Sequence, residues 1–347
     1  MRCITESERT MFRRIKQGCI YLLMKSPDFI WNAAGRVLKK RVPAQYWDAI
    51  SLERYARYLV DHFDEEWKKA AEHRRCLLIN KGDYSYSYCN VAATNNMMTM
   101  IVYALYHRYI PVINFNVDKP DYFQWNWYFR QPYEIMNTDI TGFEQKVCDV
   151  PHCELRVDMQ MVHTPGNWKH QLFRMLYRRF IRFNQETLSY IEDEIKTVGD
   201  PSRMLGVLIR GTDYIKLRPE GHPVQPKPEE IMEQVKSFFQ SGKYHAVYVA
   251  TEEKKLYDMV GSAIGMQNIR ENRRQYYDVF HEKNLEVIGK VHFDRENDNY
   301  WKGLEYISSL IILSRCQTLI AGNCGGTLFA VMMADYRDSV IFNYGVY

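Results

Sequence analysis

The chain has 347 residues, of which 46% are hydrophobic and 25% charged, with 26 tyrosines and 7 tryptophans. This is the composition of a soluble globular enzyme with room for two domains, each with a core of its own. No apolar run reaches the roughly 18 residues that cross a bilayer, and the first residues lack the apolar core of a secretory signal. The 8 cysteines are scattered without a CxxC pair, which favours a reduced, cytoplasmic compartment.

The formal net charge of +4 hides a basic amino terminus, because residues 1–41 contain ten Lys or Arg and three Asp or Glu. We interpret residues 1–50 as a basic helical extension. Its stretch "MFRRIKQGCIYLLMKSPDFIW" mixes basic and apolar residues at near-helical spacing. This pattern predicts either an interfacial helix on an anionic membrane or a helix packed on the protein's own surface. No recognition motif accompanies the charge, so nucleic acid is not expected as a partner.

Residues 51–199 are typical of a first α/β domain. A serine cap at Ser51 and amphipathic spacing predict a helix over 51–75. A strand at 76–80, a Met-rich helix over 90–108 and a strand at 109–115 follow, which predicts a βαβ crossover and hence a parallel sheet. A further helical pattern over 167–198 ends at "VGDPS", which we interpret as the domain joint.

Two stretches of this half leave alternatives open. The stretch "DYFQWNWYFRQPYEI" (121–135) concentrates aromatic side chains, which form either a stacking platform for a sugar or part of the core. Cys148, His152, Cys153 and His163 are close enough in sequence to suggest zinc, but the CxxxHC pattern does not match a familiar ligand spacing. We therefore expect no metal.

Residues 200–347 repeat the α/β pattern more clearly. Buried strands are predicted at 205–209, 245–250, 317–323 and 338–344, and helices at 228–240, 252–264, 300–315 and 324–336. The predicted fold class is therefore α/β, with two domains that face each other across a cleft.

Polar residues follow three of these strands at their carboxyl ends. They are Arg210, Thr212 and Asp213 after the first, Thr251, Glu252 and Glu253 after the second, and Asn323, Gly325, Gly326 and Thr327 after the third. Ligands of open parallel sheets bind at that edge. The two glycines leave the N–H groups of a helix start open to an anion, and Arg210 can add a bidentate guanidinium. The combination predicts a phosphorylated ligand.

The order and spacing of several sequence blocks carry a family resemblance. The blocks are "GVLIRGTDY" followed by His222-Pro223, "VYVATEE" (247–253) and "LIILSRCQTLIAGNCGGTLFA" (310–330). The stretch "YSYCNVAATNNMMTMIVYALYHRYIPVIN" (86–114) looks like a diverged N-terminal element of the same kind. Together they resemble the fucosyltransferase superfamily, loosely over about 250 residues and well in the three blocks.

The resemblance implies a GT-B fold of two Rossmann-like domains and an inverting, metal-independent transferase that uses GDP-fucose. Residues 51–199 would form the acceptor-side domain and residues 200–347 the donor domain. Carried over by position, Arg210 would hold the donor diphosphate and Asp213 would orient it or its loop. An arginine and a helix N-terminus would then meet the charge of the leaving nucleotide. The expected donor-binding residues are Arg210, Thr212, His222, Thr251, Glu252, Glu305, Asn323, Gly325, Gly326 and Thr327.

The donor side departs from the family's pattern at three places. Leu208 stands where the family commonly has His, and Gly211 stands where it has a second Arg, so one diphosphate contact is lost. Ser309 stands at the position of the guanine-reading carboxylate. Glu305 lies one helical turn earlier on nearly the same face and is the expected replacement.

The general base is a further departure. Arg218 stands where one branch of the family has the acceptor-activating carboxylate, and Glu220 is the nearest replacement. His222 either touches the donor or has a structural role in a turn.

We expect a diverged, bacterial GT-B enzyme that builds a surface polysaccharide from a nucleotide sugar and a glycan or lipid-linked acceptor, without metal or other cofactor. It would be cytoplasmic, with residues 1–41 as the candidate membrane contact. Two alternatives stay open. One is a transferase with a different nucleotide sugar, favoured by Leu208 and Ser309, and the other is a degenerate member that binds glycan or nucleotide without turnover.

Overall fold

A computed structural model describes residues 28–38, 44–80, 88–116, 121–148, 157–278 and 291–347, together with Ser26, Lys119 and Leu155. These residues belong to two compact units, Met1–Asp61 and His62–Tyr347. Much of the basic extension expected over residues 1–50 lies outside the described residues, and the domain boundary expected near residue 200 stays a prediction.

The first unit contains helix α3 (Asp28–Leu38) and the start of helix α4 (Ala44–Glu72). The rings of Trp31 and Trp47 stack with their centres 5.0 Å apart. The helix predicted to open at Ser51 begins at Ala44 instead, because buried Trp47 and Ile50 already belong to its apolar face. The predicted serine cap is therefore wrong. No helix in the described part of the chain is long and apolar enough to span a membrane.

The second unit begins with a parallel sheet of three strands. Strand β1 (Arg75–Ile79) lies between β2 (Ile110–Ile113) and β3 (Glu144–Val147). Helix α5 (Val91–Tyr106) connects β1 to β2 and begins after Asn90, whose side chain accepts a hydrogen bond from the N–H of the third residue beyond it. The predicted βαβ crossover is confirmed. Strand β3 was not predicted, because its sequence EQKV is exposed throughout and has no apolar alternation.

A larger parallel sheet follows in the same unit. Its strands are β4 (Met204–Ile209), β5 (Ala246–Thr251), β6 (Ile269–Arg270), β7 (Thr318–Gly322) and β8 (Asp338–Phe342). They lie in the order β6-β5-β4-β7-β8, and every neighbouring pair is parallel. Counted from the first strand of this sheet the order is 3-2-1-4-5, which is that of the Rossmann fold. The strand order reverses between β4 and β7, and ligands of such sheets bind at that point.

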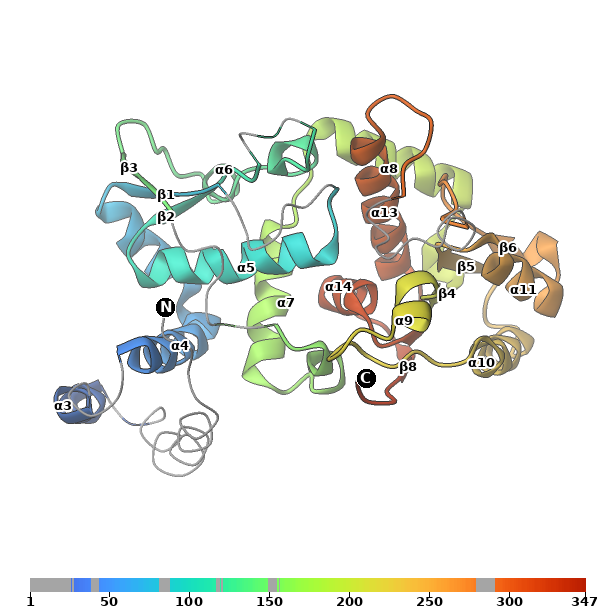
Figure 1. Cartoon of the computed structure of the whole chain (residues 1–347), viewed down its shortest axis with the longest axis horizontal. Helices are drawn as coiled ribbons and strands as arrows, with labels where there is room; N and C mark the ends of the chain where they lie inside the picture. The colour runs from blue at the N-terminus through green and yellow to red at the C-terminus, as the bar shows by residue number, and fades with distance from the viewer. Residues whose placement is uncertain are drawn as a thin grey trace. The chain divides into compact units, whose positions relative to one another are not determined.

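Helices bury both faces of this second sheet (Figure 1). Leu205, Val207 and Val249 pack on one face with helices α10 (Pro228–Gln240) and α11 (Lys254–Ile264). Leu208 and Tyr248 pack on the other with helices α13 (Asp298–Arg315) and α14 (Gly325–Met333). Strands buried on both sides need continuous apolar runs, which is why the sequence predicted β4, β5 and β7 within one residue. The α/β fold class is confirmed.

The described part of the second unit contains further helices and turns. They are helices α6 (Pro132–Ile135), α7 (Trp168–Phe180), α8 (Gln185–Val198) and α9 (Thr212–Leu217), and the 3₁₀ turns Trp125–Trp127, Met159–His163, Pro201–Arg203 and Met266–Asn268. The helical pattern predicted over 167–198 is confirmed, and it forms two helices, α7 and α8. The chain breaks after Phe180, and Asn184 caps α8 by accepting a hydrogen bond from Thr187 N at 2.9 Å.

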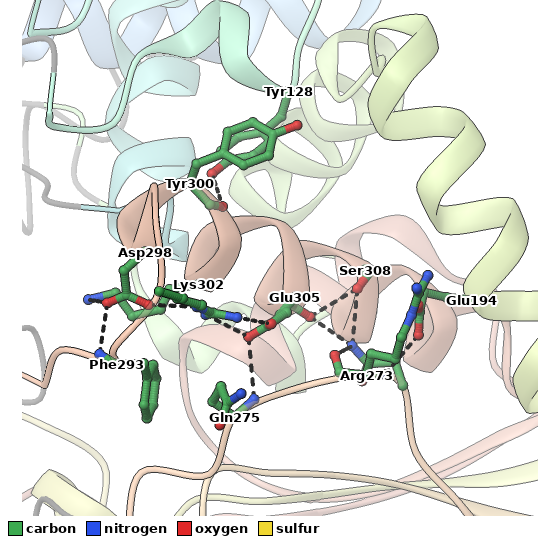
Figure 2. Close-up of polar contacts among 12 residues, drawn as sticks. Tyr128, Glu194, Arg273, Gln275, Phe293, Asp298, Tyr300, Lys302, Glu305 and Ser308 are labelled. Carbon is green, nitrogen blue, oxygen red and sulfur yellow. Dashed lines mark hydrogen bonds and ion pairs between the residues drawn. The ribbon is translucent and has the colours of Figure 1, made fainter.

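Four rings of the aromatic stretch 121–135 belong to the core. Phe123, Trp125, Tyr128 and Phe129 are all at most 2% exposed, and the rings of Trp125 and Phe129 stack at 4.2 Å. The Tyr128 hydroxyl donates to the Tyr300 carbonyl of α13 at 2.6 Å, as Figure 2 shows. Buried rings that pack against one another have no exposed face on which a sugar could stack. The interpretation of this stretch as a sugar-stacking platform is therefore wrong for these four rings.

Candidate active site

A cleft of about 820 Å³ lies at the carboxyl edge of the second sheet. One wall comes from three strand ends: Leu208, Ile209 and Arg210 from β4, Ala250, Thr251 and Glu252 from β5, and Cys324, Gly325 and Gly326 from the residues after β7. The other wall includes Asn90 and Val91 at the start of α5, with Asp158 and Lys169. The cleft lies at the point where the strand order reverses, and its volume is that of a small-molecule site. The three predicted strand ends therefore converge.

Arg210 is held at the end of β4 by two neighbours. Its guanidinium forms an ion pair with Glu252, which stands at the corresponding position after β5, and each side chain is 17% exposed. The guanidinium carbon also lies 5.1 Å from the ring centre of Tyr214 on α9. A carboxylate and an aromatic face on a guanidinium fix its direction, because its hydrogen-bond donors lie in one plane.

Gly211 cannot be replaced by a larger residue without moving Glu253. A Cβ atom built at Gly211 would collide with the Glu253 carboxylate, which occupies the space beside the chain. The resemblance predicts a second arginine at position 211. In this structure, the Glu253 carboxylate occupies the space in which the side chain of such an arginine would begin.

The structure brings a second arginine to the cleft that sequence reasoning missed. Arg274 follows β6 and lines the cleft; it donates hydrogen bonds to the Thr251 carbonyl at 2.5 Å and to the Asn272 side chain. It was missed because β6 has only two residues and no apolar run. The regular alternation of strands and helices was the available signal, since it requires a strand after the helix at 252–264.

Helix α14 begins in the wall of the cleft. Gly326 is packed so closely that a Cβ atom there would lie 3.1 Å from Leu208 and 3.2 Å from Leu310. The first N–H groups of a helix have no partner within the helix, so this start can accept an anion. Two predicted neighbours have other positions: the Thr327 hydroxyl donates to the Gly322 carbonyl at 2.6 Å, and Asn323 is fully buried. Neither is among the described residues along the cleft.

The loop after β4 places its predicted residues differently. His222 lines the cleft, with its ring centre 5.4 Å from that of Tyr214. Glu220 is exposed and is not among the cleft residues that the structure describes. The backbone of Thr212 and Asp213 forms the first turn of α9, but their side chains lie outside the described part of the structure.

Glu305, expected to read guanine, lies on α13 and is held by other residues (Figure 2). Its carboxylate accepts two hydrogen bonds from Arg295, at 2.5 and 3.2 Å, and one from Gln275 N at 3.4 Å. The described residues of the cleft include Tyr306 and Ser309 from this helix but not Glu305. Glu305 therefore lies one helical turn away from the described cleft wall, and Ser309 is the residue of this turn pair that lines it.

The charged side chains along the cleft favour an anion. Three cations, Arg210, Arg274 and Lys169, stand against two carboxylates, Glu252 and Asp158. The Arg210 and Glu252 charges cancel at close range, which leaves Arg274 and Lys169 against Asp158 among the described residues that line the cleft. No three His, Cys, Asp or Glu side chains gather as a metal site among the described residues, and His152 and Cys153 of the zinc alternative lie outside them.

Burial raises the pKa of the Tyr306 phenol well above its usual value, and the Arg210 charge opposes the rise only partly. The hydroxyl therefore stays protonated at neutral pH. It can donate a hydrogen bond into the cleft, whose wall it helps to form.

No protein-family model and no curated protein matches the sequence. Among solved structures, the chain is similar to fucosyltransferase NodZ from Bradyrhizobium, with 13% identity and a TM-score of 0.33 over 58% of this chain and 56% of that one. It is also similar to POFUT1 in complex with GDP, with 14% identity and a TM-score of 0.36 over 78% of this chain and 73% of that one. The chain thus spans little more than half of NodZ. At these identities and TM-scores the likeness assigns neither a family nor an activity to the chain.

Proposed function

We propose that the protein is a glycosyltransferase that binds the diphosphate of a nucleotide-sugar donor in this cleft. One observation carries the proposal: Arg210, Arg274 and the start of α14 line a single cleft where the strand order of a Rossmann-like sheet reverses. Arginines and a helix N-terminus are the groups that bind phosphate oxygens. In sugar transfer they would stabilise the charge that develops on the leaving nucleotide.

We further propose GDP-fucose as the donor and an inverting transfer to a glycan acceptor, in the synthesis of a surface polysaccharide. The support is the resemblance of the strand blocks to fucosyltransferases. A donor with another base is the second candidate, favoured by the pairing of Glu305 with Arg295 away from the cleft. Thermal-shift titrations with GDP, UDP, CDP and their sugars separate the two. A larger shift with UDP than with GDP contradicts the GDP assignment.

The reaction is proposed to need no metal, since Arg210, Arg274 and the α14 N–H groups supply positive charge to the diphosphate. Donor turnover should then persist in EDTA. Loss of turnover on chelation, with recovery on adding Mg²⁺ or Mn²⁺, argues against this part of the proposal.

An inverting transfer needs a base that takes the proton of the attacking hydroxyl. Glu252 is paired with Arg210, and Asp158 is the other carboxylate in the described wall of the cleft. Asp158 is exposed and accepts a hydrogen bond from Gln160 N at 2.9 Å, which fixes its direction. We therefore propose Asp158 as the base in place of Glu220.

A further inference from the structure

Arg274 comes from a part of the sheet that none of the motifs covers. Strand β6 pairs in parallel with β5, Val247 with Ile269 and Tyr248 with Arg270. Its carboxyl end therefore lies at the same edge of the sheet as the ends of β4 and β5, and the chain beyond it runs along the cleft. Arg274 is the fourth residue after the strand and lines the cleft.

A buried asparagine fixes the direction of this arginine. Asn272 is 1% exposed; its side-chain oxygen accepts from the Tyr248 hydroxyl at 2.8 Å and also from Arg274. Its side-chain nitrogen donates to the Glu305 carbonyl at 3.0 Å and to the Ser308 hydroxyl at 3.1 Å. Asn272 thus joins β5 and α13, and a fully hydrogen-bonded buried network of this kind holds one geometry.

The segment is also held from its other side. The buried carboxylate of Glu194 on α8 accepts the Arg273 N–H at 2.8 Å and pairs with the Arg273 side chain. Figure 2 shows Arg273 beside Glu194, with Glu305 and Ser308 on the neighbouring helix. Consecutive residues therefore anchor the chain to α8 and α13, which leaves Arg274 to reach the cleft from a rigid base.

Among the described residues, no carboxylate forms an ion pair with Arg274. Both of its hydrogen-bond acceptors, the Thr251 carbonyl and the Asn272 amide oxygen, are neutral, whereas Arg210 faces a carboxylate. Its Nε atom is buried and has no hydrogen-bond partner among the described residues. A buried guanidinium N–H without a partner is unfavourable, so the described contacts leave the hydrogen-bonding capacity of Arg274 incomplete.

We propose that Arg274 is the second cationic contact of the phosphate site, with Asn272 as its positioning residue. This rests on the proposed function, and it explains how the site manages without an arginine at position 211. The Glu253 carboxylate occupies the space beside Gly211, and the second guanidinium of the cleft comes from the end of β6 instead of the end of β4. The two arginines then hold the diphosphate between β4 and β6.

The experiment is calorimetric titration of inorganic pyrophosphate and of GDP into the wild type, Arg274→Gln, Arg274→Lys and the control Arg270→Gln. Arg270 is the last residue of strand β6 itself, but its side chain donates to the backbone carbonyls of Gln267 and Ile269 and is not among the described cleft residues. We expect Arg274→Gln to lose about tenfold or more in affinity for both ligands, as befits one charge-assisted contact. Arg274→Lys should recover part of the loss, and Arg270→Gln should bind like the wild type.

The titrations distinguish a failure of the proposed function from a failure of the role of Arg274. If the wild type binds neither pyrophosphate nor GDP nor UDP, the proposed function fails. If it binds them and folded Arg274→Gln binds within about twofold of it, the role of Arg274 is overturned. Should Arg274→Gln not fold, hydrogen exchange of the wild type decides: protection of residues 271–277 by pyrophosphate supports the proposal, and protection confined to residues 208–216 contradicts it.

Discussion

Arg210 at the carboxyl end of β4 forms an ion pair with Glu252 at the carboxyl end of the neighbouring strand β5. The pair joins two strand ends, and both residues line the cleft, so the guanidinium is also placed to contact a ligand there. The ion pair can therefore serve to join the strands or to position Arg210 for a ligand. A lysine at position 210 distinguishes the two roles, because it keeps the charge but loses the planar guanidinium that binds a phosphate with two hydrogen bonds.

If Arg210 binds the diphosphate, Arg210→Lys should be nearly as damaging as Arg210→Ala. We expect kcat for donor turnover to fall by about 10²-fold in both, because the contact strengthens as charge develops on the leaving group. The melting temperature should change little. Glu252→Gln is the matched variant that removes the ion pair and keeps the fork. If the pair only joins the strands, all three variants lose melting temperature and keep their turnover per folded molecule.

Gly211 and Glu253 should show strong coupling in stability. Gly211→Ala places a Cβ atom against the Glu253 carboxylate, which has to rotate aside, and should cost up to about 1 kcal/mol of unfolding free energy. The same change in a Glu253→Ala background should cost much less, because the colliding group is gone. A double-mutant cycle by denaturant unfolding measures the coupling. Equal costs in the two backgrounds would show that the Glu253 side chain does not occupy this space.

The two candidate bases can be compared directly. Asp158→Asn keeps the size of the side chain and should lower donor turnover by about 10²-fold or more, with GDP affinity unchanged. Glu220→Gln should leave turnover near that of the wild type, because Glu220 is exposed and away from the described cleft wall. Rates of donor hydrolysis, with GDP titrations beside them, make the comparison. The opposite ranking would restore the base predicted from the sequence.

The sequence predicted the elements whose apolar runs are bounded by breakers, such as β4, β7 and α10. The prediction failed where the strand was very short, or where more than one residue could cap the same helix. Ser51 has the chemistry of a cap, but tertiary burial of Trp47 lets the helix begin earlier. Asn184 is the cap that was overlooked. For the site, Arg210 and the two glycines followed from strand ends, whereas Arg274 depends on a two-residue strand and on Asn272, whose partners are distant in sequence.

The hydrogen bonds and charges around Asp298 on α13 should make the stability of the folded protein depend on pH in the acidic range (Figure 2). Burial alone would raise the pKa of Asp298, but hydrogen bonds from Arg295 and Phe293 N and the charge of Lys302 hold it below its usual 3.8. A carboxylate with a lowered folded-state pKa stabilises the fold above the unfolded-state value, and this contribution is lost as the pH falls through the folded-state pKa.

The melting temperature of Asp298→Asn should therefore lie below that of the wild type near neutral pH, and the gap should close as the pH falls below about 4. Thermal unfolding of both proteins across this range is the measurement. A gap that stays constant into acid would mean that the Asp298 carboxylate is not stabilised by these neighbours.

The basic amino terminus is proposed as a peripheral membrane contact. Deleting residues 1–41 should leave a folded protein that still binds the donor and should weaken sedimentation with anionic liposomes, since each basic residue near such a surface contributes about 1 kcal/mol. Neutral liposomes are the control. Unchanged sedimentation, or a truncated protein that does not fold, favours a helix packed on the protein's own surface.

The decisive measurement is a crystal structure of the protein with GDP. We expect diphosphate oxygens within hydrogen-bond distance of the Arg210 guanidinium and of the first N–H groups of α14, with Gly326 beside the phosphate. The guanine ring of the nucleotide would lie along the wall that Ser309 helps to form. A nucleotide bound outside this cleft, or a diphosphate held without Arg210 and α14, would contradict it.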